Sequence, residues 1–177
     1  MFRLLPETPD DTDEVEWLFD TAFAPGRTAL SSYRLRDGVG AVPGLSHIAR
    51  DEFDVIGGAV RFWPIRIGAE GAPGLLLGPI AVHPTRQGEG LGGILMRTGL
   101  QAAAQAGWAR VLLVGDAPYY ARFGFEPQPR LEFPPPTNPK RVLGLSLVPG
   151  ALEGCAGPVR PWDASQALPT GVGPACL

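Results

Sequence analysis

Apolar residues in the N-terminal third of the chain switch between strand-like and helix-like spacing. Residues 2–5 form a short apolar run that predicts a first strand. Apolar residues spaced by threes and fours predict a helix over 8–23, with capping and acidic residues at its start. Two runs, 47–50 and 55–67, flank the polar turn 51–54 and predict a β-hairpin.

The spacing of apolar residues also predicts the elements of the middle and C-terminal parts of the chain. A continuous apolar run at 75–82 predicts a strand, and Gly78–Pro79 inside it predicts a bulge, because proline cannot donate to a strand ladder. We predict a helix over 94–106, a buried strand at 110–114 and a returning strand at 142–147. Leu91, just before this helix, and Ile94, Leu95, Thr98 and Ala102 within it are expected to lie on one face.

Loops and domain limits are indicated by proline, glycine and weak periodicity. Residues 24–44 carry no clear pattern beyond a short helix near 30–35, and Asp116 with Pro118 predicts the start of a short helix. No internal repeat is present. We therefore expect one domain over 1–152 and an irregular, Gly- and Pro-rich extension over 153–177.

A glycine-rich turn between the strand at 75–82 and the following helix points to phosphate binding. Glycines let backbone N–H groups converge, and the helix N-terminus behind them is electropositive. A P-loop would need a lysine after its last glycine, but the only lysine is Lys140. A dinucleotide fingerprint fits poorly, because residues 83–86 separate the strand from the glycines.

The surrounding residues resemble the GNAT superfamily of N-acetyltransferases. The segment 82–92, Val-His-Pro-Thr-Arg-Gln-Gly-Glu-Gly-Leu-Gly, is similar to its acyl-CoA-binding motif, although Glu89 replaces a basic or amide residue often found there. The segment 115–125, ending Tyr-Tyr-Ala-Arg-Phe-Gly-Phe, resembles the block that flanks the thioester. The tail at 147–152 also resembles one bacterial subgroup of small predicted acetyltransferases. The resemblance implies an α/β (α+β) fold, in which a mixed, mainly antiparallel sheet flanked by helices has a splayed central strand pair.

The resemblance also implies roles for particular residues. Acetyl-CoA, or another short acyl-CoA, would be the co-substrate, and no metal would be needed. Tyr120 matches the frequent general acid that protonates the departing thiolate, with Tyr119 as the adjacent alternative. The cofactor is expected to contact the end of the strand, Arg86 and the turn, that is Ile80, Ala81, Val82, Arg86, Gln87, Gly88, Glu89, Gly90, Leu91, Gly92 and Gly93.

No residue of the sequence is marked out as a general base. His83 is a candidate because an imidazole is the usual base near neutral pH, but a residue at a strand end more often makes structural hydrogen bonds, and His47 in the hairpin is no better a candidate. Asp116 is expected to cap a helix rather than act as a base. Further candidates are carboxylates expected on the surface, Glu16, Glu52 and Asp54, and arginines that could line an anionic acceptor site or simply be solvated, Arg27, Arg34, Arg36 and Arg61.

Composition narrows the class of protein. Of the 177 residues, 45% are hydrophobic and 19% charged, as in a globular domain, and a net charge of −3 gives no footprint for nucleic acid. No apolar run is long enough to span a bilayer, and Cys155 and Cys176 lack metal-type spacing, so a reduced, cytoplasmic setting is expected. A homodimer is compatible with the sequence, which indicates no oligomeric state.

The sequence thus predicts an acyl-CoA-dependent N-acetyltransferase that acts on a primary amine, of a small molecule or a protein, by direct attack. The alternative is a module that binds acyl-CoA without turnover.

Overall fold

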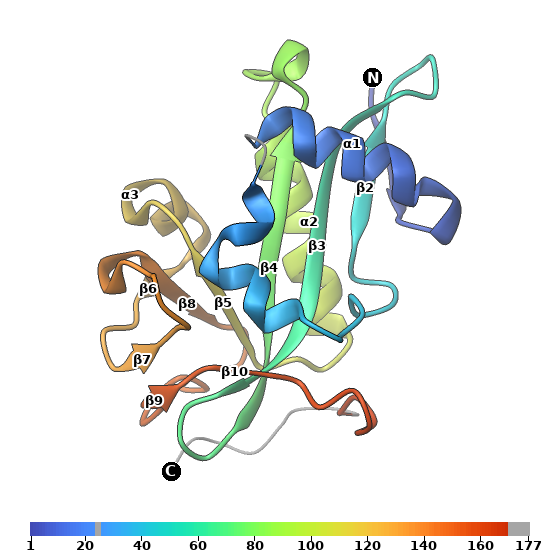
Figure 1. Ribbon diagram of the computed structural model, residues 1–177. Helices are drawn as coiled ribbons and strands as arrows, with labels where there is room; N and C mark the ends of the chain where they lie inside the picture. The colour runs from blue at the N-terminus through green and yellow to red at the C-terminus, as the bar shows by residue number, and fades with distance from the viewer. Residues whose placement is uncertain (24–25, 170–177) are drawn as a thin grey trace.

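The computed structural model describes residues 1–23 and 26–169. Its main element is a mixed eight-stranded sheet with the order β1-β2-β3-β4-β5-β8-β6, and β10 pairs with β3 (Figure 1). All pairs are antiparallel except β4 with β5, which confirms the expected mixed, mainly antiparallel sheet. The strands are β1 (Arg3–Pro6), β2 (His47–Arg50), β3 (Ile56–Ile67), β4 (Ala72–Val82), β5 (Arg110–Val114), β6 (Glu126–Pro127), β8 (Val142–Ser146) and β10 (Arg160–Pro161).

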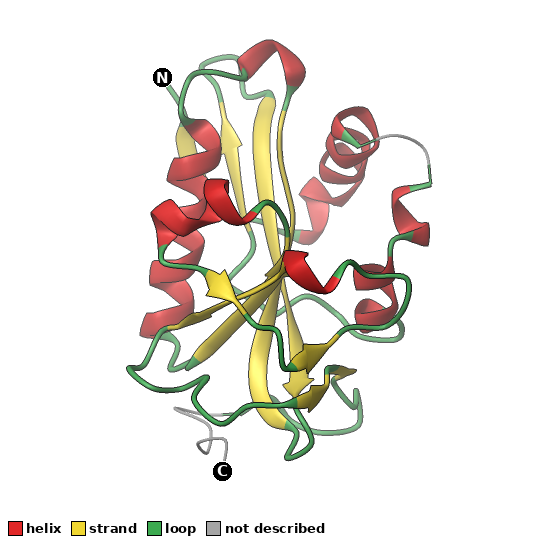
Figure 2. Cartoon of the chain, turned by 90° about the vertical axis from the view of Figure 1, so that its left-hand side faces the viewer, coloured by secondary structure: helices red, strands yellow, loops and turns green. Residues whose placement is uncertain are grey.

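Helices cover both faces of the sheet (Figure 2). On one face, α1 (Thr12–Ala22) buries Val15, Leu18 and Phe19 against β2, β3 and β4. On the other, α2 (Leu91–Gln105) packs on the same strands. The short α3 (Ala117–Tyr120) follows β5, and two 3₁₀ helices, Arg27–Ala29 and Ser31–Arg36, follow α1.

The buried face of α2 differs from the predicted one. The helix begins at Leu91, three residues before the predicted start, and Ile94 is 43% exposed. The buried residues follow two neighbouring lines along the helix, with a spacing of four residues within each line. The face that contacts the sheet is therefore rotated away from Ile94, Thr98 and Ala102. The buried residues are Leu91, Leu95, Met96, Gly99, Leu100 and Ala103.

The two central strands separate at the predicted bulge. β4 and β5 pair only at Leu75–Val111 and Leu76–Leu112. The β3–β4 register then shifts, so that Phe62 faces Leu77 and Val60 faces Ile80, which leaves Gly78–Pro79 unpaired. The indole N–H of Trp63 donates to the Gly78 carbonyl at 2.6 Å and holds the bulge against β3. The β5-facing edge of β4 beyond Leu76 is therefore open.

The described part of the C-terminal extension, residues 153–169, packs on the domain. We expected it to be irregular, but it contains two short strands. β9 (Gly157–Pro158) pairs with β7 (Leu131–Glu132), and β10 pairs with the far end of β3. Trp162 is buried. Cys155 is also buried. Cys176 and the other residues of 170–177 lie outside the described part.

Candidate active site

The glycine turn leaves its backbone N–H groups without partners in the described part of the chain. Gly88 and Gly90 have φ of 87° and 77°, values that favour glycine, and Gly90 is the N-cap of α2. The first helical bond runs from the N–H of Ile94 to the carbonyl of Gly90 at 3.2 Å. Among the described residues, none accepts a hydrogen bond from the N–H groups of 87–93. The start of a 15-residue helix thus presents unpaired donors.

These donors border a cavity of about 420 Å³, called here the turn cavity. Three arginines, Arg86, Arg97 and Arg122, line it together with Val82 at the end of β4. Its full lining is Val82, Arg86, Gln87, Gly88, Gly90, Leu91, Gly92, Gly93, Arg97, Tyr119, Arg122 and Phe123. Converging N–H groups, a helix N-terminus and guanidinium groups are suited to binding an anion such as a pyrophosphate.

Two of these arginines were not singled out from the sequence. Arg97 lies four residues after Gly93, one helical turn along α2, and its guanidinium packs over the ring of Phe123. Arg122 stacks on the ring of Tyr119 and donates from Nε to the Tyr119 carbonyl at 3.0 Å. The helical spacing could have indicated Arg97. Arg86 is bound by Asp51 at 2.6 Å, so it is less free to bind an anion than a solvated arginine.

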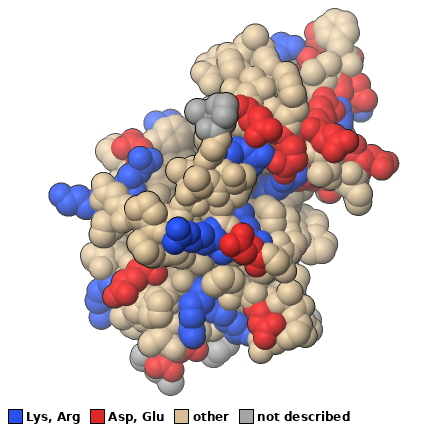
Figure 3. Space-filling model, in the orientation of Figure 1, with Lys and Arg blue, Asp and Glu red and all other residues tan. Residues whose placement is uncertain are grey.

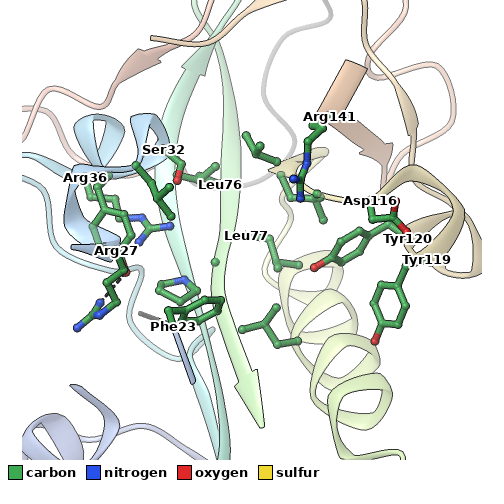
Figure 4. Close-up of a pocket in the computed structure, with 18 residues that line it drawn as sticks. Phe23, Arg27, Ser32, Arg36, Leu76, Leu77, Asp116, Tyr119, Tyr120 and Arg141 are labelled. Carbon is green, nitrogen blue, oxygen red and sulfur yellow. Dashed lines mark hydrogen bonds between the residues drawn. The ribbon is translucent and has the colours of Figure 1, made fainter. Parts of the chain in front are cut away.

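A second cavity, of about 350 Å³, lies where β4 and β5 separate and is called here the bulge cavity. One wall is the β4 segment 76–80, and another is the end of β5 with α3. The third wall comes from Phe23 and the 3₁₀ helices at 27–36, far away in the sequence (Figure 4). Tyr119 lines both cavities, so the two adjoin.

Tyr119 and Tyr120 differ in environment although they are neighbours in the chain. Tyr120 packs so closely on Gly115 that a Cβ there would lie 2.3 Å from its ring, and it lines only the bulge cavity. The Tyr119 hydroxyl lies near the start of α2, 3.7 Å from where a Cβ of Gly92 would be. In Figure 4 the two hydroxyls point in different directions, that of Tyr120 toward Leu77 of β4.

The environment of Tyr120 keeps its hydroxyl protonated. Burial raises the pKa of the phenol, and the neighbouring Tyr119 and Asp116 raise it further, against an opposing effect of Arg141. A phenol with a raised pKa is a proton donor throughout the neutral range. Among the predicted strand-end residues, Ile80 lines the bulge cavity and Val82 the turn cavity, whereas Ala81 packs against α1.

Known proteins that resemble this chain include acetyltransferases. A sequence model of the acetyltransferase (GNAT) domain matches residues 43–127. The chain is 31% identical over 120 residues to the uncharacterized N-acetyltransferase YhbS of Escherichia coli, an alignment that covers 68% of this chain and 71% of YhbS. The chain belongs to the GNAT acetyltransferase family.

Two further relatives extend this GNAT assignment. The uncharacterized N-acetyltransferase YjhQ of Escherichia coli strain K12 is 34% identical over 118 residues, which cover 66% of this chain but only 65% of YjhQ. A GNAT acetyltransferase from Brucella melitensis, solved in complex with acetyl-CoA, superimposes with a TM-score of 0.70 at 28% identity and covers 94% of this chain and 99% of that one.

The solved structure of Escherichia coli YhbS, in complex with CoA, superimposes with a TM-score of 0.78 at 26% identity, and covers 96% of this chain and 94% of that one. The predicted resemblance and fold class are confirmed. The relatives bound to CoA and acetyl-CoA agree with the predicted co-substrate. No cluster of potential metal ligands and no helix long and apolar enough to cross a membrane occurs in the described part of the GNAT chain.

Both histidines of this GNAT protein lie outside the bulge cavity lining. His47 is buried and its Nδ1 is 2.7 Å from the Leu45 carbonyl. His83 stacks on Trp17, and its Nδ1 is 2.8 Å from the Thr85 hydroxyl. Asp116 occupies the N-cap position of α3 as predicted, but its side chain makes no capping hydrogen bond and it lines the bulge cavity.

The other predicted carboxylates are held in ion pairs. Glu52 binds the N-terminal amine and Asp54 binds Arg3, both at exposed positions. Glu16 is not an ordinary surface carboxylate, because it pairs with both Arg27 and Arg61. Burial alone would raise its pKa, but hydrogen bonds from those two guanidinium groups lower it overall, which makes Glu16 a poor base.

Proposed function

We propose that this protein transfers an acetyl or other short acyl group from acyl-CoA to a primary amine. The observation that carries the proposal is that the two cavities adjoin at Tyr119, beside the open edge of β4. Unpaired N–H groups at 87–93 would bind the pyrophosphate, and the Tyr120 hydroxyl lies in the adjoining cavity. Backbone groups of Ile80 and Val82 at the open edge would pair with the pantetheine amides. The transferase domain would span 1–152, with 153–177 as an extension.

The proposed chemistry is a direct attack without a covalent enzyme intermediate. The amine nitrogen attacks the thioester carbonyl, a C–N bond forms, and the C–S bond breaks. The departing thiolate takes its proton from Tyr120, whose raised pKa keeps it protonated until then. Holding the thioester beside the amine supplies much of the rate enhancement in such a reaction.

Removal of a proton from an incoming ammonium needs little from the protein. Among the described residues, Asp116 is the carboxylate that lines the bulge cavity, and no histidine does. An amine that arrives neutral needs no base, and water or Asp116 could accept the proton of a charged one. Tyr120 would therefore act in the chemical step, and the turn would bind the cofactor.

The alternative is a module that binds acyl-CoA without turnover. CoA binding does not distinguish a transferase from such a module, because both would bind CoA. The deciding experiment measures thiol release from acetyl-CoA across a broad panel of amines, with binding of CoA followed separately. Thiol release above the rate without protein, from any amine, supports the transferase. Tight CoA binding with no thiol release from any amine contradicts it and favours the binding module.

A further inference from the structure

Acidic side chains beside the bulge cavity form ion pairs mainly with two arginines. Figure 3 shows acidic side chains gathered over α1, next to basic ones. The guanidinium of Arg27 donates to Asp20 at 2.8 Å and to Glu16, and Arg61 donates to Glu7 at 2.6 Å and also to Glu16. These two arginines are therefore neutralised by protein carboxylates.

Arg36, at the end of the 3₁₀ helix Ser31–Arg36, lies in the same cluster without such a partner. No carboxylate of the described residues forms an ion pair with it. Its Nε and Nη1 are fully enclosed and make no hydrogen bond to any residue that the structure describes. The guanidinium stacks on the ring of Tyr33, 4.0 Å from the centroid, with Trp63 at 5.4 Å. An enclosed cation without an anion is costly unless a ligand supplies the charge.

Titration does not remove this charge at neutral pH. Burial lowers the pKa of Arg36 to about 10, with a smaller contribution from the like charges of Arg27 and Arg61, and against an opposing effect of Tyr33. The group is still a cation under physiological conditions. An anion bound beside it would offset the burial cost.

The remaining nitrogen of Arg36, Nη2, lies beside β4. Nη2 is 3.4 Å from where a Cβ of Gly78 would be, so it lies beside the bulge that opens β4. In Figure 4, Arg36 lies on the opposite side of the cavity from Tyr120 and Arg141. An acceptor bound between these walls would have its amine on the Tyr120 side and an anionic group at Arg36.

The rest of the cavity favours an anion with an apolar side chain. Arg141 lines the opposite wall, is exposed and forms no ion pair with a described residue, whereas Asp116 is the one carboxylate in the described lining. Apolar surface comes from Phe23, Leu30, Leu76, Leu77 and Leu113. Guanidinium groups bind carboxylates with good geometry.

We infer that the acceptor is an amino acid with an apolar side chain, whose carboxylate binds Arg36 while its amine faces the thioester. This inference rests on the proposed transferase function and narrows its substrate class. It separates the protein from transferases that act on peptide N-termini, because the first residue of a peptide has no free carboxylate beside its amine.

The test compares matched acceptors and matched variants. L-Phenylalanine is compared with its amide and with 2-phenylethylamine, and L-leucine with its amide and with 3-methylbutylamine, by thiol release from acetyl-CoA. O-Phosphoethanolamine serves as the phosphate probe. Arg36→Gln is compared with Arg34→Gln, because Arg34 is exposed on the same 3₁₀ helix and does not line the cavity. Arg36→Lys keeps the positive charge but lacks the planar guanidinium group. It replaces Arg36→Gln in the comparison if that variant does not fold.

We expect the free amino acids to exceed their amides in kcat/KM by about tenfold or more. Arg36→Gln should lower kcat/KM for the amino acid by about 10- to 100-fold, mainly through KM, which is the effect of losing a charged hydrogen bond. CoA affinity and the Arg34→Gln variant should be unchanged. Equal rates for acid and amide, a preference for O-phosphoethanolamine, or equal effects of the two glutamine variants would overturn the inference while leaving the transferase proposal intact.

A binding measurement separates the two proposals. Calorimetry on CoA-loaded protein compares N-acetyl-L-phenylalanine with its amide. If no acceptor releases thiol but the acid binds at least about tenfold more tightly than the amide, and Arg36→Gln abolishes the difference, the carboxylate site stands and the transferase proposal fails. If neither compound binds and no thiol is released, both proposals fail.

Discussion

At the scale of single residues, two adjacent tyrosines have different surroundings. Tyr120 is packed on Gly115 with its hydroxyl in the bulge cavity, and Tyr119 extends toward Gly92 at the start of α2. Their rings meet edge to face with centroids 4.9 Å apart. The sequence alone favoured Tyr120 only through its resemblance to a family block, because the rotation of a four-residue helix cannot be deduced from its sequence.

Replacing Tyr120 by phenylalanine should therefore lower kcat by about 100-fold or more, since it removes the proposed proton donor. Its fold and CoA affinity should persist, because the ring still packs on Gly115. The measurement is steady-state thiol release with CoA binding by calorimetry. Tyr119→Phe is the matched control and should retain most activity.

The pH dependence gives a second readout of the same substitution. A raised pKa means that Tyr120 keeps its proton beyond the ordinary phenol range, near pH ~10, so its loss should lower kcat only above that pH. The Tyr120→Phe variant should lack this alkaline decline. A Tyr120→Phe variant whose kcat equals that of the unaltered protein at every pH would remove Tyr120 from the mechanism.

At the scale of elements, the junction of β4 and α2 combines a bulge and a glycine turn. Both were predictable, since proline in a strand and glycines before a helix have direct backbone consequences. The contact face of α2 was not predictable to this accuracy. Alanine, glycine and threonine make the helix apolar on several sides, and packing against Phe62 selects the face that includes Gly99.

Replacing Gly90 by valine should weaken CoA binding by about tenfold or more. A β-branched residue is strained at φ of 77°, so the turn must change shape and its N–H groups lose their convergence. Gly38→Val is the control, since Gly38 has φ of 70°, is exposed, and lies outside both cavities. Calorimetric titration with CoA measures both. Equal affinity of the two variants would contradict binding by the turn.

Replacing Gly99 by alanine should destabilise the fold by about 1–3 kcal/mol, because the added Cβ would lie 2.5 Å from the Phe62 ring. Gly40→Ala is the control, since a Cβ at Gly40 meets no atom within 4 Å. Urea unfolding monitored by circular dichroism gives the two free energies. A loss as small as that of Gly40→Ala would mean that α2 does not pack this closely on β3.

At the scale of the whole molecule, the bulge cavity is assembled from segments far apart in the chain. The sequence predicted the wall that includes Tyr120, because both motifs lie within residues 82–125. For the wall at 27–36 it offered arginines as candidates for an anionic acceptor site, but it could not separate that role from plain solvation, because the segment has no clear periodicity. Which arginine is neutralised depends on the placement of Glu7, Glu16 and Asp20, and this placement requires the folded chain.

Carboxylates that are bound by arginines and backbone N–H groups should make stability sensitive to acid. Burial would raise the pKa of Asp11, but hydrogen bonds from Arg50 and Thr8 lower it overall. Backbone N–H groups of Val55 and Phe53, together with Arg86, lower the pKa of Asp51. A lowered pKa in the folded state gives stability that is present above the unfolded value, roughly pH 4, and is lost as the pH falls further.

The midpoint of urea unfolding should thus be level between pH 7 and about pH 5 and decline below about pH 4. Arg50→Met removes the guanidinium that binds Asp11 and Glu14, so its decline should be shallower. A parallel pH dependence of the variant and the unaltered protein would show that these pairs do not set the acid limit.

The account depends most on acyl-CoA lying along the open edge of β4, with its pyrophosphate at the start of α2. A crystal structure of the protein with acetyl-CoA tests this directly. We expect the pyrophosphate oxygens within about 3 Å of backbone N–H groups of 87–93, and the sulfur within about 3.5 Å of the Tyr120 hydroxyl. A pyrophosphate bound elsewhere, or a sulfur remote from Tyr120, would contradict the account.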